Sequence, residues 1–257
     1  MRLSIPELAI GNSTSEVLTA LTRANERIKA IFVFSYRPPP LLQQRLDFTT
    51  DEASIVEDAI VQRKATNLPF WDSLLLSCFN KAGGYERLLQ QTTFHQNHKE
   101  TFRRISKDEI CRGHLTDLVM RVSADESYSF SSQVELSEAR LAHLPLLDFH
   151  CPETLKNDRL VSEVCKYLFE APAFIFSSGE SYHAIGSTLL EAGDLQTFLV
   201  KSLFFAPVVD RAYVAHQMLE GACALRLSSS LAKPNVPKLK LCTGIVREGT
   251  DHKPQPQ

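Results

Sequence analysis

The chain lacks the features that mark structural zinc sites and membrane spans. Its six cysteines lie far apart and none forms a C-x-x-C pair, which argues against a structural zinc site. The apolar runs are too short to cross a bilayer, and the first residues have no basic region followed by an apolar core. We therefore expect a cytoplasmic protein with reduced thiols and without a membrane partner.

A strong excess of one charge is also absent. The chain has 257 residues, with 28 Lys and Arg against 30 Asp and Glu, which gives a formal net charge of -2. No global positive field therefore favours nucleic acid, although a local basic groove is compatible with this balance. The hydrophobic content of 44% is typical of a globular chain, and the length allows one large domain or two small ones.

The N-terminal part has mainly helical patterns. Ser13 and Glu16 have the spacing of a capping box, which predicts a helix that runs to about Ala30. The apolar run 31–36 predicts a strand. In residues 52–106 the apolar side chains have mostly helical spacing, so we expect helices there.

Two histidines in this helical stretch could be metal ligands. His95 and His98 are three residues apart and could share one face of a helix. Their flanks are charged and no third ligand is nearby, so solvent-exposed polar residues are the simpler interpretation.

From about residue 115 the patterns change. Residues 118–122 and 128–136 alternate apolar and polar side chains, as strands do, and the run 144–149 is nearly continuous and apolar, as in a central strand. Asn157 is a candidate N-cap for the helix that follows. Further strands are expected at 174–176 and 224–228, and further helices at 195–205 and 210–220.

These patterns predict an α+β fold. We expect a mainly helical N-terminal portion over residues 1–110, an α+β core over 111–246 and a disordered tail over 247–257. The boundary near residue 110 follows the change in pattern, and the two portions could share one core.

The first candidate site residue ends the apolar run. Asp148 alone is explained most simply as a turn cap, because Cys151 and Pro152 follow it. His150 shares its strand face, because side chains alternate along a strand. A lone histidine is usually a hydrogen-bonded residue of the core or an edge. Asp148 and His150 together could bind a divalent metal, although imidazole favours transition metals over magnesium.

A Ser-x-His pair follows the next strand. Ser181 and His183 lie on one face if the strand continues past Gly179, and both could contact phosphate oxygens. A serine hydrolase is disfavoured, because the G-x-S-x-G elbow is absent and neighbours two apart on a strand are poorly placed for base-activated attack.

Asp210 and Arg226 complete the set of candidates. Asp210 precedes Arg211 and is by default a helix N-cap. Arg226 stands inside an apolar strand, where it either points outward or is held to pair with phosphate. Carboxylates, hydroxyl, imidazole and guanidinium together could hold a divalent metal and a nucleoside triphosphate on one surface.

The order of these groups resembles the three motifs of the archaeo-eukaryotic primase superfamily, the primase-polymerases. That pattern has an acid-x-acid pair that ends an apolar strand, a Ser-x-His after a small-residue turn, and a hydrophobic-Asp that a Leu-Arg strand often follows. Within this superfamily, the motif pattern most resembles that of the divergent bacterial primase 1D-like proteins, which are often found in mobile-element or antiviral systems. The resemblance covers about residues 115–230 and implies an RRM-like catalytic core.

The resemblance also implies roles and partners. It implies Asp148 and Asp210 as catalytic ligands of Mn²⁺ or Mg²⁺, with His150 as a third metal ligand. It implies triphosphate contacts by Ser181 and His183, and a phosphate contact by a further residue, Arg226. The implied partners are a nucleoside triphosphate, a single-stranded nucleic acid or primer-template, and a protein of a defence complex.

One position departs from the family pattern. His150 stands where the family has its second carboxylate, so magnesium binding should weaken more than manganese binding. We interpret the chain as primase-polymerase-like, with nucleotidyl transfer left open. The first alternative is a catalytically degenerate nucleotide- or nucleic-acid-binding subunit of a defence complex. The second is a metal-dependent phosphoesterase that uses Asp148, His150, His183 and Asp210.

Overall fold

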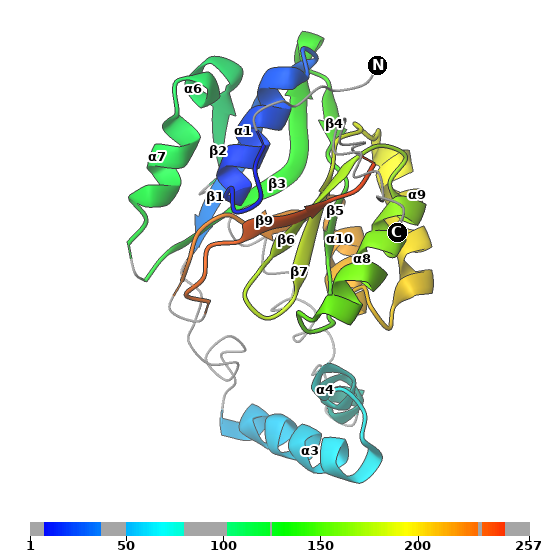
Figure 1. The fold of residues 1–257 in the computed structure, drawn as a ribbon. Coiled ribbons are helices and arrows are strands. Elements are labelled where there is room, and N and C mark those ends of the chain that lie inside the picture. Colours follow the sequence, from blue (N-terminus) through cyan, green and yellow to red (C-terminus); the bar gives the residue numbers. More distant parts are fainter. Residues whose placement is uncertain (1–7, 37–49, 80–101, 124, 231–232, 245–257) are drawn as a thin grey trace, which may run out of the picture.

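The computed structural model describes residues 8–36, 50–79, 102–123, 125–230 and 233–244. Its helices and antiparallel strands form an α+β fold (Figure 1), which confirms the predicted class. The predicted tail over 247–257 and the pair His95 and His98 lie outside the described residues. Within the described part of the chain, no helix is long and apolar enough to cross a membrane.

The first sheet is built around two long neighbouring strands. Its path is β2 (Phe102–Ser106), β1 (Ile28–Tyr36), β3 (Ser127–Leu136) and β4 (Leu141–His143), and β8 (Ala224–Arg226) also pairs with β3. All these pairs are antiparallel. Because β1 and β2 pair with each other and β1 with β3, the sheet continues across the boundary that the sequence placed at residue 110.

Three helices accompany this sheet: α1 (Thr14–Ala24), α6 (Lys107–Cys111) and α7 (His114–Met120). The predicted capping box is confirmed, since Ser13 and Glu16 bond each other's backbone N–H groups. The helix ends at Ala24 rather than near Ala30, because Ile28 is already paired with Leu136 in the sheet.

Two other local predictions in this region were wrong. Residues 102–106 form a strand rather than a helix, because they pair along the edge of β1. The alternation over 118–122 belongs largely to helix α7, in which Leu115 and Val119 are buried one helical turn apart while Met120 is exposed. Short segments of this kind are ambiguous in sequence, because helical and strand periods overlap over a few residues.

The second sheet carries the candidate site. Its order is β5 (Leu146–Asp148), β7 (Tyr182–Gly186), β6 (Ala173–Ser177) and β9 (Lys238–Cys242). Helix α8 (Leu155–Leu168) connects β5 to β6, and β7 lies between these strands and antiparallel to both. This is a split β-α-β unit. Helix α9 (Ala192–Ser202), the short 3-10 helix η3 (Leu203–Phe205) and helix α10 (Arg211–Glu220) follow β7.

The two sheets share one core, since their buried apolar residues form a single cluster. Helix α8 contributes Val161, Val164 and Cys165 to this core from one face. Its N-cap is Thr154, whose hydroxyl accepts the Asn157 N–H, so the prediction of Asn157 as the cap was wrong by one turn.

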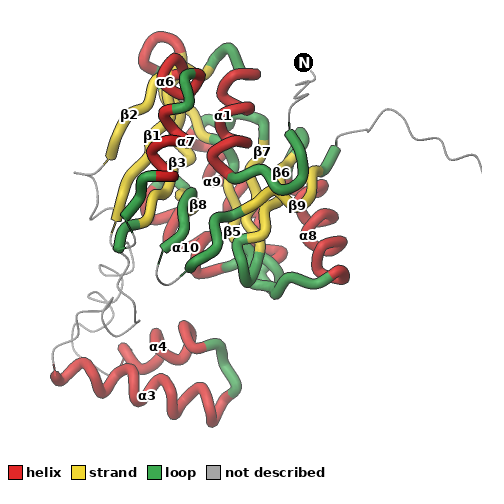
Figure 2. Tube along the Cα trace, turned by 60° about the vertical axis from the view of Figure 1, so that its left-hand side comes forward, coloured by secondary structure: helices red, strands yellow, loops and turns green. Residues whose placement is uncertain are grey.

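A helical hairpin lies in the chain between β1 and β2. Helices α3 (Thr50–Thr66) and α4 (Phe70–Phe79) pack along each other, apart from the sheets in both views (Figures 1 and 2). They bury a small cluster of their own, made of Ile55, Val56, Ala59, Leu74 and Cys78. An ion pair between Asp72 of α4 and Arg211 of α10 links the hairpin to the second half of the chain.

Candidate functional site

Asp148 and His183 lie directly opposite each other on neighbouring strands. They are register partners in the antiparallel pair of β5 and β7, so they share one face of the sheet. The His183 Nε2 atom is 3.6 Å from the Asp148 Oδ1 atom. The structure therefore brings together two residues that stand 35 positions apart in the sequence.

Asp210 joins this pair through the backbone. Its N–H donates to the Asp148 carbonyl oxygen at 2.9 Å, and Phe149 and Val209 form an isolated antiparallel bridge beside it. The Asp210 Oδ1 atom accepts the N–H groups of residues 212 and 213, so the predicted N-cap of α10 is confirmed. The cap fixes the Asp210 carboxylate, whose charge raises the pKa of Asp148.

The pair is buried enough to disfavour charge on both partners. Burial and then the Asp210 carboxylate raise the pKa of Asp148 to about 8, against the opposing effect of Lys233 and Arg226. Burial and then the charges of Arg226 and Lys233 lower the pKa of His183 to about 3. Both side chains are therefore largely neutral near pH 7.

Each partner also has a buried polar atom that makes no hydrogen bond with any residue that the structure describes. These atoms are Asp148 Oδ1 and His183 Nδ1. The Asp148 side chain remains 29% exposed, so its carboxyl group is in contact with solvent on one side. An unsatisfied buried polar atom costs free energy, and such atoms concentrate where a ligand binds.

Arg226 lies at the end of β8 in the first sheet, and its side chain is held in the interior. Its side chain is buried, with Nη1 donating to the carbonyl oxygens of Ser228 and Asn235, both at 2.6 Å, and Nη2 donating to that of Ser178 at 3.0 Å. The guanidinium thus connects three backbone segments. The charge of the guanidinium group acts on Asp148 and His183. These Nη1 and Nη2 N–H groups donate to backbone oxygens and not to solvent.

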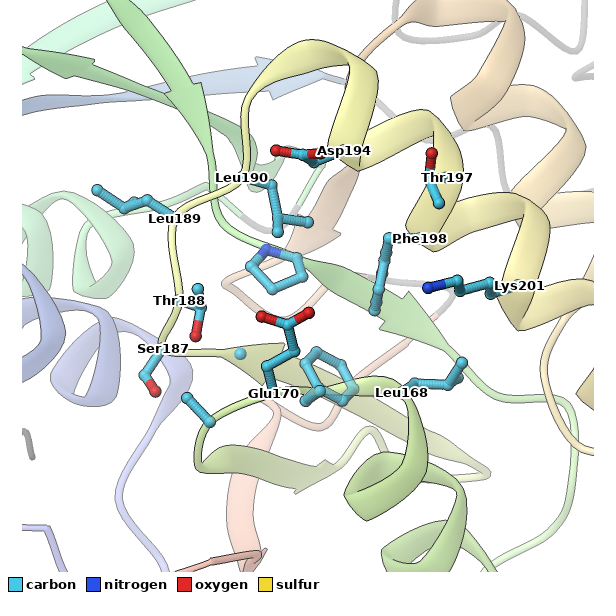
Figure 3. A pocket seen from close by; sticks show the side chains of 14 residues that line it. Leu168, Glu170, Ser187, Thr188, Leu189, Leu190, Asp194, Thr197, Phe198 and Lys201 are labelled. Atoms are coloured by element: carbon cyan, nitrogen blue, oxygen red, sulfur yellow. The ribbon is translucent and has the colours of Figure 1, made fainter.

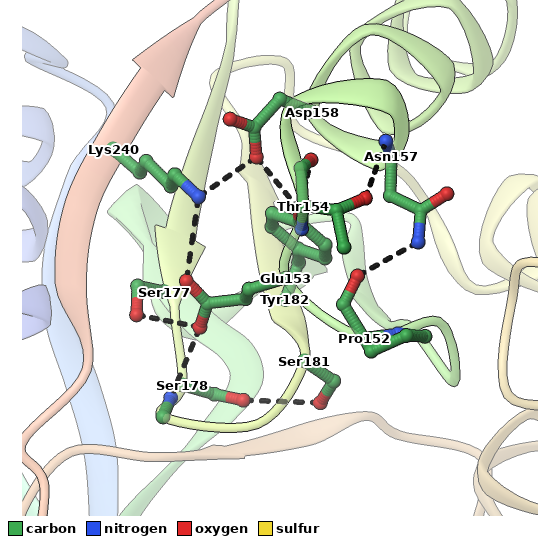
Figure 4. A network of polar contacts seen from close by, with 11 residues as sticks. Pro152, Glu153, Thr154, Asn157, Asp158, Ser177, Ser178, Ser181, Tyr182 and Lys240 are labelled. Carbon is green, nitrogen blue, oxygen red and sulfur yellow. Dashed lines mark hydrogen bonds and ion pairs between the residues drawn. The ribbon is translucent and has the colours of Figure 1, made fainter.

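Ser181 closes the turn before β7. The Ser178 N–H donates to the Ser181 carbonyl oxygen at 2.9 Å, and the two hydroxyl oxygens lie 3.1 Å apart (Figure 4). Gly179 has a φ of +106°, which a side chain would disfavour, and an added Cβ would lie 3.0 Å from Asn235 Nδ2. Ser181 is half-buried and two residues before His183.

His150 is placed differently from the other candidates. It is exposed, and its backbone N–H donates to the Val208 carbonyl oxygen. Among the residues that the structure describes, no group of three or more His, Cys, Asp or Glu side chains is gathered to hold a metal ion. The carboxylates of Asp148 and Asp210 do fit a magnesium-type cation, because such ions commonly use one or two carboxylates together with substrate phosphates and water.

The sequence analysis missed one residue of this environment. Lys233 acts on both Asp148 and His183 through its charge, and it forms an ion pair with Glu180 at the tip of the turn. It stands in the connection between β8 and β9, where its sequence context is an ordinary surface loop. Only the pairing of distant segments places it near the site.

A separate cavity of about 260 Å³ lies at the opposite end of β7 (Figure 3). Its wall includes Gly186, where a Cβ would lie 2.4 Å from Phe169 Cδ1, so the strand and the end of α8 are closely packed. Phe198 of α9 forms the facing wall and makes an edge contact with Phe169. None of the candidate residues lines this cavity.

Comparison with protein-family models matches residues 107–238 to the family described as archaeo-eukaryotic primase 1D-like. The matched region spans slightly more than half of the chain and contains all the candidate site residues. Searches of curated proteins and of solved structures found no match.

Proposed function

The chain belongs to the archaeo-eukaryotic primase 1D-like family, and from this premise we propose that it binds a nucleoside triphosphate, a divalent cation and a nucleic-acid strand at the site of Asp148, His183 and Asp210. The observation that carries the proposal is the cross-strand pair of Asp148 and His183, each with a buried polar atom that lacks a hydrogen-bond partner among the described residues. A purely structural pair would be expected to satisfy these atoms.

An RRM-like core is part of this proposal. Its support is the split β-α-β unit of β5, α8 and β6, with β7 between the strands. Tyr182 bonds Asp158 of α8, so α8 covers the Tyr182 face of the sheet. His183 is the next residue in the strand and lies on the other face. The site thus lies on the face away from α8.

Asp148 and Asp210 would hold the cation. A bound divalent ion would supply positive charge to the triphosphate oxygens. Asp148 binds a cation only as a carboxylate, and its raised pKa means that metal binding is linked to loss of its proton.

The remaining residues would bind the triphosphate. As a neutral imidazole, His183 carries one N–H that can donate to a phosphate oxygen, and Ser181 can donate through its hydroxyl. Arg226 and Lys233 add two positive charges near the pair. Because its donors bond backbone oxygens, Arg226 would act on phosphate mainly through its charge.

The reaction that we propose for this site is nucleotidyl transfer, and one observation favours a binding subunit instead. His150, in place of a second carboxylate, is exposed and belongs to no described three-ligand group. A phosphoesterase that uses His150 with Asp148, His183 and Asp210 finds no support among the described residues for the same reason. The defence-complex setting remains a proposal from the resemblance.

Substituting His150 with aspartate tests transfer against binding alone. We expect His150→Asp to raise magnesium-supported nucleotide transfer at least tenfold, about 1.4 kcal/mol in barrier, because it adds a hard anionic ligand two residues after Asp148. Primer synthesis and extension on a single-stranded template would be followed with labelled nucleotides in magnesium or manganese.

The matched control for His150→Asp is His114→Asp, which adds the same charge at an exposed histidine of α7. If the His150→Asp protein binds nucleotide but, like the wild type, shows no transfer, the binding subunit is favoured. Robust magnesium-dependent synthesis by the wild-type protein would show that the imidazole does not limit the reaction.

A further inference from the structure

The turn that carries Ser181 has little support of its own. One backbone hydrogen bond closes it, and Gly179 and Glu180 at its tip are exposed. The position of this turn decides where the Ser181 hydroxyl lies relative to His183. Contacts from outside the hairpin must therefore hold it.

Glu153 supplies such contacts from the segment between β5 and α8. Its Oε1 atom accepts the Ser177 hydroxyl at 2.6 Å and the Gly179 N–H at 3.3 Å (Figure 4). Its side chain is only 21% exposed. Glu153 thus bonds both the end of β6 and the tip of the turn with one oxygen.

Lys240 holds Glu153 in place. Its Nζ atom lies 2.8 Å from Asp158 Oδ1 and 3.4 Å from Glu153 Oε2. The register of β9 explains its direction: Leu239 pairs with Phe176 and Leu241 with Ile175, so Lys240 is the extra residue of a bulge. A bulge re-aims a side chain, here toward the acids beside α8.

Tyr182 connects this network to the strand of His183. It is fully buried, and its hydroxyl donates to Asp158 Oδ1 at 2.6 Å and accepts the Thr154 N–H at 3.1 Å. The Lys240 ammonium lies 5.2 Å from the centre of its ring. The residue between Ser181 and His183 is therefore fixed from the face opposite to the site.

We infer that Glu153, braced by Lys240, is a positioning residue for nucleotide binding. It holds the Ser177–Ser181 turn from the α8 side, while Arg226 holds the Ser178 carbonyl oxygen from the other. The inference rests on the proposed function of the site. Glu153 and Lys240 do not touch the nucleotide. They fix the positions at which Ser181 and His183 contact it.

The test compares Glu153→Ala, Glu153→Gln and Lys240→Met with the wild-type protein. Nucleoside triphosphate affinity would be measured by titration with manganese, and opening of the turn by amide hydrogen exchange at Gly179. For Glu153→Ala we expect at least tenfold faster exchange at Gly179 and about tenfold weaker nucleotide binding. Glu153→Gln keeps an acceptor oxygen and should bind within about threefold of wild type.

The matched control is Glu163→Ala, which removes an exposed carboxylate of α8 that pairs with Lys166. It should change neither exchange at Gly179 nor nucleotide affinity. If Glu153→Ala fails to fold, Lys240→Met provides the same test, because it removes the brace but keeps the apolar stem. It should weaken nucleotide binding severalfold.

Three failures are distinguishable. Wild-type affinity in Glu153→Ala, with faster Gly179 exchange, would overturn the positioning role and leave the proposed function intact. Absence of nucleotide binding by the wild-type protein would overturn the proposed function and the inference that depends on it. Unchanged Gly179 exchange in Glu153→Ala would separately show that Glu153 does not hold the turn.

Discussion

Asp148→Asn should make the metal-free protein more stable and abolish its metal-dependent nucleotide binding. The carboxyl group is buried beside Asp210, and these two causes raise its pKa from 3.8 to about 8. An uncharged amide of the same shape folds without taking up a proton but is a poor metal ligand. We expect a gain of about 1–3 kcal/mol in the free energy of unfolding at pH 7.5, allowing for partial exposure of the side chain.

The pH dependence gives the sign of this effect. Below about pH 4 both the folded and the unfolded protein hold the proton of residue 148, so the wild-type and Asp148→Asn proteins should be equally stable. Between pH 4 and 8 the unfolded state releases that proton while the folded state retains it. Wild-type stability therefore falls relative to Asp148→Asn as pH rises, and the difference stops growing above about pH 8.

Asp158→Asn is the matched control, with the opposite sign. Burial alone would raise the pKa of Asp158, but hydrogen bonds from Lys240 and Tyr182 lower it below its usual value. This substitution should destabilise the protein at pH 7.5, and the loss should fade as pH falls below the ordinary aspartate pKa of about 4. Urea unfolding at several pH values measures both variants. A marked loss of stability in Asp148→Asn at pH 7.5 would contradict a ligand role and indicate a structural one.

Arg226→Met should destabilise the protein by about 3–5 kcal/mol, because it leaves a buried set of carbonyl oxygens without their charged donor. The affected oxygens belong to Ser178, Ser228 and Asn235. Arg226→Lys should recover little, since one ammonium cannot reproduce the planar guanidinium fork. Urea unfolding monitored by circular dichroism gives the free energy of unfolding for each variant.

Arg211→Met is the control for this prediction. Arg211 pairs with Asp72 at an exposed position, and such pairs contribute about 0–1 kcal/mol. If Arg226→Met lowers the free energy of unfolding by less than about 1 kcal/mol, the structural role of the three Arg226 hydrogen bonds is contradicted. If Arg226→Met were as stable as the wild type but bound nucleotide poorly, the residue would be a direct phosphate ligand, as the resemblance implied.

Some features of the candidate region follow from local patterns in the sequence. Ser-x-His, the Asp210 cap and the strand at Asp148 are local patterns, and local patterns determine which residues share a strand face. The motif order predicted that Asp148 and His183 share one sheet surface, and in the sheet they are register partners. The split β-α-β unit depends on which distant strands pair, and no local period encodes that choice.

The sequence could not predict which residues hold the motifs in place. Arg226 lies inside an apolar strand, and only three carbonyl oxygens from separate segments explain why it is buried. Lys240 is placed by a bulge in β9, which alternation of side chains cannot predict. Glu153 looks like an ordinary residue before a helix until Gly179 is found within hydrogen-bonding distance.

The central claim is that Asp148, His183 and Asp210 bind a nucleoside triphosphate with a divalent cation. The most direct measurement is calorimetric titration of a nucleoside triphosphate into the wild-type and His183→Ala proteins, with manganese, with magnesium and with chelator. We predict binding only with the metals, stronger with manganese, and weaker by about 1–3 kcal/mol in His183→Ala. Equal affinity in chelator, or unchanged affinity in His183→Ala, would contradict the account.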